Sequence, residues 1–279
     1  VFISFQSNLY FILLAKLTGN KIIARSNAAP NYYISNSLKK KIFKIIFGFA
    51  DKIIVNSKEF QKIFEKTFKI KPIIIYNPSI NKKLLKKYSR KKIKKNKKII
   101  NFINVGRLTN QKNQILLIKA LSQIDDLNYK LIIVGNGREE INLRRYIEQN
   151  KLKKRIKIIK NVSNANQYYI KSDVFILTSR FEGLPNVLIE AQLNKKFIIS
   201  SDCPSGPKEI LLNGKAGYLF RNQSMNDLKK KIINYQKNMN KRNIFNKIQC
   251  GFNNLDRFDE INNLQKYYDE IISLWLKKT

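Results

Sequence analysis

The stretch Asp173–Gln192, DVFILTSRFEGLPNVLIEAQ, decides the predicted fold because it joins a strand to a helix through a loop that contains glycine and proline. The run DVFILTS is apolar and is typical of a strand. Gly183 and Pro185 then interrupt the chain, and NVLIEAQ begins a helix. Strands that alternate with helices form parallel sheets, and ligands bind at the carboxyl ends of those strands. The loop between the strand and the helix is therefore the first candidate for a functional site.

The same alternation runs along the chain and predicts two α/β units. Before residue 81, strand-like runs are VFISF, KIIAR, DKIIVNS and KPIIIYNPS, with helix-like segments between them. Residues 81–98, NKKLLKKYSRKKIKKNKK, lose the apolar pattern and predict a solvated linker or, alternatively, a surface that docks on anionic lipid. Six strand-like runs follow: IINFINVG, YKLIIVG, RIKIIK, DVFILTS, KFIIS and AGYLF. This second series is a complete doubly wound pattern.

The composition of the 279-residue chain excludes several kinds of site. The chain has no histidine, which removes Ser-His-Asp triads, histidine metal ligands and histidine acid–base catalysis. Cys203 and Cys250 are too few for a disulfide framework or a zinc cluster, and they fit a reducing cytoplasm. No apolar run approaches the roughly 18 residues of a membrane span. Because the chain opens as VFIS, within a strand-like run and without a methionine, we expect it to lack the beginning of its protein.

The formal charge of +36 has three interpretations. Lysine, isoleucine and asparagine are abundant throughout, as in proteins from AT-rich genomes, so the first interpretation is that the charge is compositional. The second is attraction to anionic lipid, at about 1 kcal/mol per basic residue near the surface. The third is binding to nucleic acid, but the sequence shows no module of clustered basic and aromatic residues for that purpose. We favour the first and expect no nucleic-acid partner.

The loop after DVFILTS carries two glutamates, Glu182 and Glu190, with seven residues between them. The start of the helix offers free N–H groups and a positive dipole end, which together form an anion site. Glu182 stands just before the helix and could accept hydrogen bonds from sugar hydroxyls, while Glu190 could hold a vicinal diol. Two structural alternatives stay open: Glu182 could complement the helix dipole, and Glu190 could be a solvated helix acid.

A second loop, NVGRLTNQKN, follows the first strand of the second unit. Its Gly106 would let a ligand approach the backbone, and Arg107 and Lys112 could clamp a diphosphate. The GNG turn at residues 135–137 lacks the GxGxxG pattern of a dinucleotide site, so we expect it to be structural.

Taken together, these segments resemble the retaining GT-B glycosyltransferases of family 4, also described as glycosyl transferases group 1. The resemblance covers INVGRLTNQKN, GNGREEINLRRYIEQNKL, YYIKSDVFILTSRFEGLPNVLIEAQ and ISSDCPSGPKEILLNGKAGYLF, in the family's order. The two glutamates match the E-x7-E motif of the family. Upstream, ADKIIVNS and IIYNPSI are similar to landmarks at the end of the family's N-terminal domain.

The resemblance implies an α/β fold of the GT-B type, with two Rossmann-like domains that face each other across a cleft. We expect residues 1–88 to form an incomplete N-terminal domain on the acceptor side. Residues 97–257 would form the C-terminal domain that binds a nucleotide-sugar donor. The tail, residues 258–279, has apolar residues at helical spacing, and we expect this helix to pack back on the N-terminal domain.

The resemblance also assigns roles to residues of the second unit. Arg107 and Lys112 would contact the donor diphosphate, Glu190 the ribose hydroxyls and Glu182 the transferred sugar. No metal and no cofactor are expected, because no Asp-x-Asp motif occurs and the two cations would stabilise the leaving group. The expected donor-binding set is Gly106, Arg107, Lys112, Gly183, Asn186, Val187, Leu188 and Glu190, with Glu182 as the catalytic residue.

The acceptor side departs from the family pattern. The chain lacks the glycine-rich acceptor loop that family members usually carry near the N-terminus. Many members also place a histidine near the reacting sugar, in a region that corresponds here to ARSNAAPNYY. Arg25, Ser26 and Asn27 stand there instead. Either another polar group replaces the histidine or the relevant residue lies outside this chain.

The resemblance predicts a transferase of bacterial cell-surface glycan biosynthesis. SDCPSGPKEIL is most similar to the corresponding loop in enzymes that build surface polysaccharides, lipopolysaccharides or lipid-linked oligosaccharides, often from UDP-linked donors. The expected partners are a nucleotide-sugar and a saccharide or lipid-linked acceptor. The expected location is the cytoplasm, with peripheral contact to the anionic inner face of the plasma membrane. The alternatives are a GT-B-like nucleotide-sugar epimerase and a non-catalytic nucleotide-sugar binder.

Overall fold

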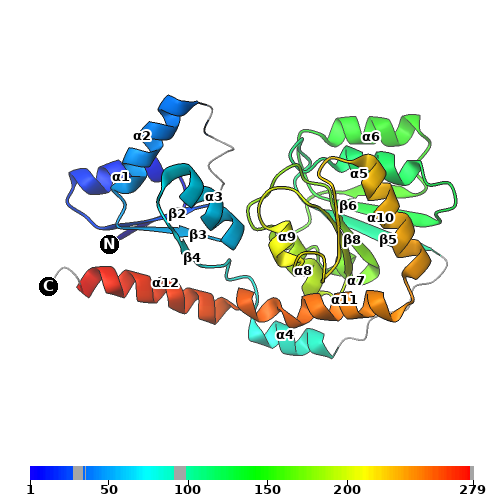
Figure 1. The fold of residues 1–279 in the computed structure, drawn as a ribbon. Helices are drawn as coiled ribbons and strands as arrows, with labels where there is room; N and C mark the ends of the chain where they lie inside the picture. Colours follow the sequence, from blue (N-terminus) through cyan, green and yellow to red (C-terminus); the bar gives the residue numbers. More distant parts are fainter. Residues whose placement is uncertain (28–33, 35, 91–98, 277–279) are drawn as a thin grey trace. The chain divides into compact units, whose positions relative to one another are not determined.

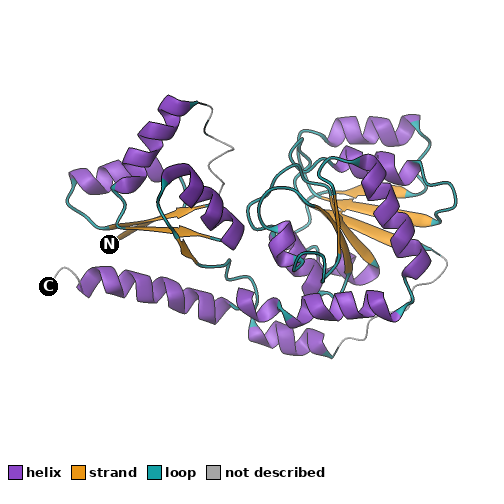
Figure 2. Ribbon diagram, viewed as in Figure 1, coloured by secondary structure: helices purple, strands orange, loops and turns teal. Residues whose placement is uncertain are grey.

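The structure, a computed structural model, describes residues 1–27, 34, 36–90 and 99–276 (Figure 1). The chain divides into unit 1, Val1–Lys82 with Asp256–Thr279, and unit 2, Lys83–Leu255. In each unit helices cover a sheet whose strands are all parallel (Figure 2). The predicted α/β class is confirmed.

Unit 1 contains a four-stranded sheet in the order β1-β2-β3-β4. Its strands are β1 (Phe2–Ser4), β2 (Ile22–Ser26), β3 (Lys52–Val55) and β4 (Ile73–Ile74). Its helices are α1 (Asn8–Leu17), α2 (Ser37–Gly48), α3 (Lys58–Phe68) and α12 (Glu260–Trp275), which the short 3-10 helix η2 (Leu255–Phe258) precedes.

Alternation along β2 and β3 gives this sheet two buried faces. Ala24 and Val55 point into the core that α1, α2 and α3 cover. Ile23 and Ile54 point to the opposite face, where they pack with Tyr267 of α12. Successive side chains of a strand leave opposite faces, so one apolar run can supply both layers. The final helix therefore belongs to unit 1, where it forms the second helical layer.

Unit 2 contains a six-stranded sheet in the order β10-β9-β8-β5-β6-β7. Its strands are β5 (Ile100–Val105), β6 (Tyr129–Val134), β7 (Ile156–Ile159), β8 (Val174–Leu177), β9 (Phe197–Ser201) and β10 (Tyr218–Phe220). Its helices are α4 (Lys82–Ser89), α5 (Gln114–Ser122), α6 (Glu140–Gln149), α7 (Asn166–Lys171), α8 (Asn186–Leu193), α9 (Pro207–Ile210), α10 (Met225–Asn238) and α11 (Arg242–Asn253).

The strand order of unit 2 reverses between β5 and β8. From β5 the chain adds β6 and β7 on one side, and then returns to add β8, β9 and β10 on the other. The registered pairs between β5 and β8 are Phe102 with Val174 and Ile103 with Phe175. Beyond them the buried Asn104 side chain donates to the Ile176 carbonyl at 2.8 Å. Ligands of doubly wound folds bind at such a reversal, outside the carboxyl ends of the strands.

The predicted linker at residues 81–98 was partly wrong. Lys82–Ser89 form helix α4, in which Tyr88 is buried and its hydroxyl donates to Asn166 Oδ1 at 2.8 Å. Because lysines occupy most of residues 81–98, the sequence pattern did not reveal that the Tyr88 side chain is buried against unit 2. Residues 91–98 lie outside the described residues, as do residues 28–33 of the segment ARSNAAPNYY and residues 277–279 of the predicted final helix.

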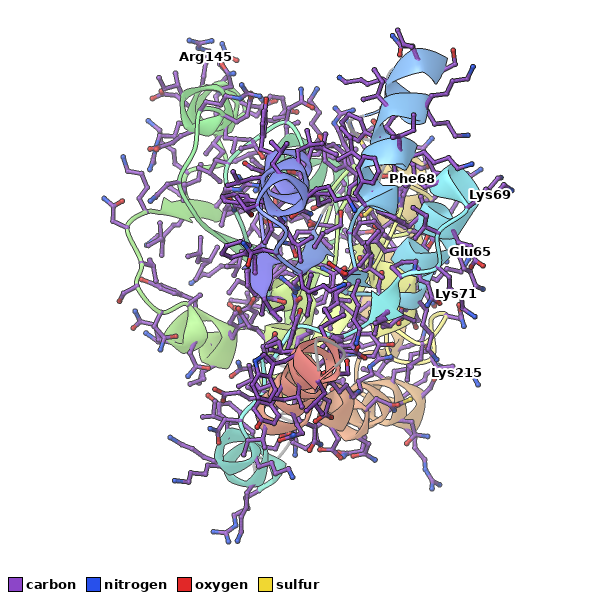
Figure 3. All side chains as sticks on the ribbon, turned by 90° about the vertical axis from the view of Figure 1, so that its left-hand side faces the viewer. Glu65, Phe68, Lys69, Lys71, Arg145 and Lys215 are labelled. Carbon is purple, nitrogen blue, oxygen red and sulfur yellow. The ribbon has the colours of Figure 1, made fainter. Side chains whose placement is uncertain are left out.

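Basic side chains project into solvent from both units (Figure 3). Exposed examples are Lys69 and Lys71 in unit 1, and Arg145 and Lys215 in unit 2. A spread of this kind is what a compositional origin of the charge predicts. Within the part of the chain that the structure describes, no helix combines the length and apolarity needed to cross a bilayer.

Phe64 offers a test of the unit 1 core. Its buried ring lies 5.0 Å from that of Phe47 and 4.8 Å from that of Phe68, between centroids. Phe64→Ala should lower the free energy of unfolding by about 3–5 kcal/mol, because it leaves a cavity in this aromatic cluster. Trp275, the single tryptophan, lies on α12, so its fluorescence during urea unfolding reports on unit 1. The exposed Tyr268, changed to alanine, is the control; equal losses would contradict the packing described.

Candidate functional site

The loops that follow β5 and β8 are joined to each other at the reversal of strand order. The Thr178 hydroxyl donates to the Lys112 carbonyl at 2.9 Å. The Arg180 backbone N–H donates to the Gln111 carbonyl at 2.8 Å, and the Gln111 amide donates to the Phe181 carbonyl at 3.0 Å. These bonds hold residues 107–113 against residues 178–182 although they lie about 70 residues apart in the chain.

Lys112 and Glu182, which the sequence predicted at one donor site, form an ion pair. Lys112 Nζ lies 2.6 Å from Glu182 Oε1, and the Ser179 hydroxyl donates to the same oxygen at 2.5 Å. The Glu182 side chain is only 6% exposed and that of Lys112 only 14%. A buried pair of charges needs such close partners because both ions lose their hydration. The Glu182 backbone is fixed as well, since the Ser205 hydroxyl donates to its carbonyl at 2.7 Å.

Arg107 lies on the same loop as Lys112 but is exposed. Its backbone is fixed, because the Gln114 amide donates to its carbonyl at 3.0 Å. Its guanidinium takes part in no ion pair among the described residues. Gly106 precedes it, and the aliphatic part of Lys112 passes 3.6 Å from the point where a Gly106 side chain would begin. The loop thus presents one paired and one unpaired cation.

The GNG turn supports this loop from the next strand. A Cβ on Gly135 would lie 1.9 Å from the Gly106 carbonyl oxygen, and one on Gly137 would lie 2.3 Å from the Leu108 carbonyl oxygen. The Leu108 backbone N–H donates to the Asn136 carbonyl at 2.8 Å. Because only glycine fits this approach, the turn has the structural role predicted from the sequence.

Helix α8 begins at Asn186, directly after the Gly183–Pro185 break, and its N-cap residue, Pro185, makes no side-chain cap hydrogen bond. Asn186 is exposed and Val187 is half-buried, whereas Leu188 is buried. A loop from β9 lies against the break, where a Cβ on Gly206 would meet the Gly183 carbonyl oxygen at 2.2 Å. The predicted backbone contacts to a donor thus fall at one helix end, beside the buried Glu182.

Glu190 lies in a different environment from Glu182. It is exposed on α8, near the Tyr169 hydroxyl of α7, which donates to the Val187 carbonyl at 3.2 Å. Desolvation by the surrounding protein raises the pKa of Glu190, and the nearby Tyr169 hydroxyl partly offsets this rise. Burial, with the nearby Glu190 charge, raises the pKa of Tyr169 well above its usual range, so this hydroxyl stays protonated as a donor.

The sequence analysis missed three neighbours of the predicted residues. Ser179 donates to Glu182, and Tyr169 lies near Glu190, as described above. Cys203 is the third: its pKa is raised to about 12, mainly by burial, and it lies near the charges of Glu182 and Lys112. Ser179 could have been found, because it precedes Glu182 by three residues in the same loop. The other two come from distant segments and carry no local signal.

A pocket also missed from the sequence lies at the carboxyl end of β7. It has a volume of about 460 Å³ and is lined by loop residues 159–164 and by α7. Its polar lining includes Asn161, Ser163 and Gln167. Because α7 also carries Tyr169, this pocket adjoins the helix that contacts Glu190.

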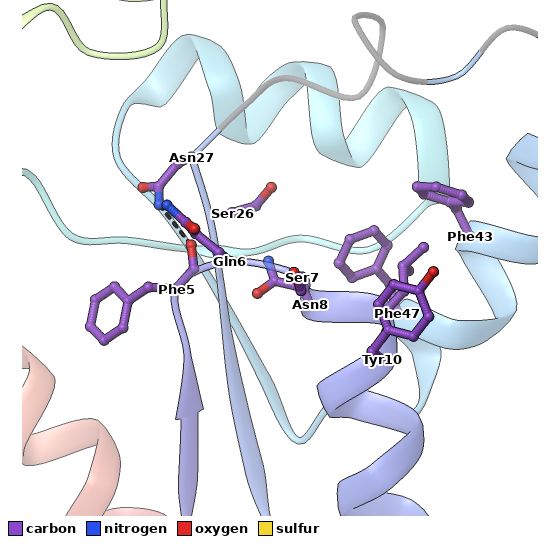
Figure 4. A pocket seen from close by; sticks show the side chains of 10 residues that line it. Phe5, Gln6, Ser7, Asn8, Tyr10, Ser26, Asn27, Phe43 and Phe47 are labelled. Carbon is purple, nitrogen blue, oxygen red and sulfur yellow. Dashed lines mark hydrogen bonds between the residues drawn. The ribbon is translucent and has the colours of Figure 1, made fainter.

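In unit 1, Arg25, Ser26 and Asn27 stand where many family members place a histidine, and the structure puts them in two different surroundings. Arg25 donates to Asn77 Oδ1 at 2.6 Å, and its guanidinium lies over the rings of Phe5 and Tyr267. Ser26 and Asn27 instead line a pocket of about 390 Å³ at the carboxyl ends of β1 and β2 (Figure 4). Asn27 donates to the Phe5 carbonyl at 2.9 Å there. Residues 28–33 of this region lie outside the described residues.

A doubly wound unit with cationic loops at its strand reversal defines a class of α/β proteins that bind phosphate-bearing ligands. Residues 86–249, more than half of the chain, match the family of glycosyl transferases group 1. The chain belongs to this family, as the sequence predicted.

Relatives and a solved structure agree with this assignment. An uncharacterized glycosyltransferase of Methanocaldococcus jannaschii is 35% identical over 67% of this chain and 49% of that protein. The N-acetylgalactosamine-N,N'-diacetylbacillosaminyl-diphospho-undecaprenol 4-alpha-N-acetylgalactosaminyltransferase of Campylobacter jejuni is 28% identical over 78% of this chain and 62% of that protein. The crystal structure of Anabaena Alr3699/HepE in complex with UDP has a TM-score of 0.77 at 20% identity, over 95% of this chain and 76% of that chain.

The chain therefore spans about half to three fifths of the length of these curated relatives. The structural likeness shows that the fold is of the GT-B type, in agreement with the predicted fold class.

Gly135→Ala tests the support of the cation-bearing loop. The added methyl group would overlap the Gly106 carbonyl, so we expect a loss of about 2–3 kcal/mol in the free energy of unfolding of unit 2. Gly48→Ala on α2, where the added atom meets nothing within 4 Å, should instead be neutral or stabilising by up to about 1 kcal/mol. Chemical unfolding followed by far-ultraviolet circular dichroism measures both. A neutral Gly135→Ala would show that the loop is not held this way.

Proposed function

We propose that the chain is part of a glycosyltransferase that moves a sugar from a UDP-linked donor to a saccharide or lipid-linked acceptor in bacterial surface-glycan biosynthesis. One observation carries the proposal. The Lys112–Glu182 pair and the exposed Arg107 lie at the strand reversal, on loops that meet beside the start of α8. This arrangement combines cations for phosphate, a carboxylate for hydroxyls and the N-terminal end of a helix.

The Lys112–Glu182 pair suggests how contacts to the donor would replace a contact within the protein. In the structure the Lys112 ammonium and the Glu182 carboxylate satisfy each other's charge at 2.6 Å. A diphosphate that enters the crevice would compete for the Lys112 ammonium, and Arg107 would add a second cation. Glu182 would then be free to accept hydrogen bonds from hydroxyls of the transferred sugar. Binding of the whole donor thereby replaces one ion pair with two sets of ligand contacts.

The same two cations would stabilise the leaving group. When the bond between the sugar and the nucleoside diphosphate breaks, negative charge grows on the diphosphate. Arg107 and Lys112 stand on fixed backbone segments and would meet this charge with little reorganisation. We therefore propose transfer without a metal ion and, from the family resemblance, with retention of the anomeric configuration.

The nucleoside end of the donor would lie toward α7 and α8. Glu190 is exposed on α8, near the Tyr169 hydroxyl of α7, so its carboxylate could accept from both ribose hydroxyls. The pocket at the carboxyl end of β7 adjoins α7 and offers amide and hydroxyl groups for a base. Glu182 and Glu190 would thus hold the two ends of one donor.

The choice of UDP and of a surface-glycan acceptor draws on the similar proteins. The Anabaena structure contains UDP, and the name of the Campylobacter relative specifies an undecaprenyl-diphosphate-linked acceptor. The expected setting is the cytoplasmic side of the membrane, where such acceptors are extended. A nucleotide-sugar epimerase is the second candidate; it would convert a UDP-hexose to its epimer without any acceptor, which chromatography of the incubated donor would reveal.

Nucleotide binding should not require a divalent metal. Isothermal titration calorimetry with UDP in EDTA should give the same affinity as with added Mg²⁺. Arg107→Gln and Lys112→Met should each weaken binding by about ten- to a hundredfold, because each removes a charged hydrogen bond to phosphate. Arg145→Gln, an exposed change on α6, is the matched control. Complete loss of UDP binding in EDTA would contradict the proposal that binding needs no metal ion.

The two glutamates should differ in what they recognise. Glu190→Gln should weaken UDP and UDP-sugar alike by about ten- to a hundredfold, since it disrupts the grip on the ribose. Glu182→Gln should leave UDP affinity unchanged or raise it, because Lys112 loses its competing carboxylate. It should remove the extra affinity of a UDP-hexose over UDP. Equal effects of both changes on UDP binding would contradict this division.

The pH dependence supplies a second readout for Glu190. Its pKa is raised, so protonation should begin at a higher pH than for an ordinary glutamate. UDP affinity should fall as pH drops through this raised pKa and should be fully present above it. The Glu190→Gln profile retains only the titration of the nucleotide, and the difference between the two profiles isolates the carboxylate. Identical profiles would remove Glu190 from the ribose site.

A further inference from the structure

Ser179 is a buried hydroxyl residue whose partner differs in kind from those of its neighbours. Its hydroxyl donates to the Glu182 carboxylate at 2.5 Å. The other buried hydroxyl groups of β9 and of the loops after β8 and β9 donate to backbone carbonyl oxygens; they belong to Thr178, Ser200, Ser201 and Ser205. Within this group, which the structure describes in full, only Ser179 donates to a charged side chain.

Two of these serines fix the backbone at both ends of the Ser179–Glu182 contact. The Ser201 hydroxyl donates to the Ser179 carbonyl at 2.8 Å, and the Ser205 hydroxyl donates to the Glu182 carbonyl at 2.7 Å. The Glu182 backbone N–H donates to the Pro204 carbonyl at 3.2 Å. The bond between the Ser179 hydroxyl and the Glu182 carboxylate therefore joins two points of the loop whose backbone is already held against the loop after β9.

The two oxygens of the Glu182 carboxylate are used unequally. Lys112 Nζ and the Ser179 hydroxyl both bond Oε1. No hydrogen bond from the part of the chain that the structure describes reaches Oε2. An ionised carboxylate can accept on both oxygens, at about four positions in all. Oε2 therefore stays available to a further donor while Oε1 is occupied.

Donor binding, as proposed above, would increase the importance of the Ser179 bond. A diphosphate that takes the Lys112 ammonium removes one of the two partners of Glu182 Oε1. The Glu182 side chain is only 6% exposed, and a buried charge that loses its partners is costly. The Ser179 hydroxyl, which belongs to the same loop, would remain bonded to the carboxylate and keep it in place.

We propose that Ser179 is a positioning residue of the donor site. It holds Oε1 of Glu182 when Lys112 turns to the diphosphate, so that Oε2 can accept a hydrogen bond from a hydroxyl of the transferred sugar. This inference rests on the proposed function, because it requires a diphosphate that competes for Lys112. The serine acts through the carboxylate and makes no contact with the donor itself. If Ser179 only stabilised its loop, the effect of removing its hydroxyl would not depend on either charge.

UDP binding, measured by calorimetry, tests this role. Ser179→Ala should weaken UDP binding about tenfold, because Glu182 would lose its remaining partner when the diphosphate takes Lys112. The same change in a Glu182→Gln chain should alter UDP affinity by less than about twofold, because no buried charge then needs the hydroxyl. Ser200→Ala is the matched control, since that serine is equally buried but donates to the Ser201 carbonyl at 3.0 Å. It should leave UDP affinity unchanged.

Chemical unfolding without any ligand, followed by circular dichroism, tests the same contact independently. Lys112→Met imitates the state in which a diphosphate has withdrawn the ammonium. In that chain Ser179→Ala should raise the unfolding equilibrium constant of unit 2 about tenfold more than it does in the unchanged chain. Ser200→Ala should have the same effect in both chains. If Lys112→Met does not fold, the comparison of UDP binding with and without Glu182→Gln decides alone.

Two results would overturn the proposal. Ser179→Ala could match Ser200→Ala in both measurements, which would make the serine an ordinary part of its loop. Its effect on UDP affinity could also persist in the Glu182→Gln chain, which would mean that it does not act through the carboxylate. Failure of the unchanged chain to bind UDP is a separate outcome. It would contradict the proposed function, while the unfolding of the Lys112→Met chain would still show whether Ser179 supports Glu182.

Discussion

The site depends on the reversal of strand order between β5 and β8. Beyond the two registered residue pairs, no ladder continues between the loops that follow these strands. Side chains supplement the backbone hydrogen bond from the Arg180 N–H to the Gln111 carbonyl. Asn104 does so at the end of the strands, and Thr178 does so between the loops. A crevice with polar, fixed walls is the direct result, and it is the reason that this fold binds ligands at this point.

The Lys112–Glu182 pair gives the crevice its electrostatic character. Two charges of opposite sign, both largely removed from water, cancel much of each other's field. Arg107 remains as a cation on the rim. Glu182 is also bonded by Ser179, so its position is set before any ligand arrives. Burial of a carboxylate for stability alone would be costly, which favours the interpretation that the pair exists to be exchanged.

The sequence predicted the elements well because their signals are local. Runs such as DVFILTS and YKLIIVG carry enough apolar residues to define buried strands, and the order of strands and helices then fixes a parallel sheet. The family resemblance brought Lys112 and Glu182 to one site. Their direct contact joins residues 70 positions apart, and no local pattern encodes it. Helix α4 was missed for the opposite reason, since its lysines obscured a local signal. The exposure of Leu38 and Ile45 on α2 also needed the structure, because an apolar residue on a helix does not reveal whether the core covers it.

The buried Cys203 has a consequence for the chemistry that the crevice tolerates. With a pKa of about 12, roughly one such thiol in a hundred thousand is ionised at pH 7. Oxidation by peroxide proceeds through the thiolate, so this sulfur is protected although it lies near a lysine that would ordinarily promote ionisation. The half-buried Cys250, on α11, is the more accessible of the two free thiols. The thiol that lies near the Lys112–Glu182 pair is therefore the less readily oxidised of the two.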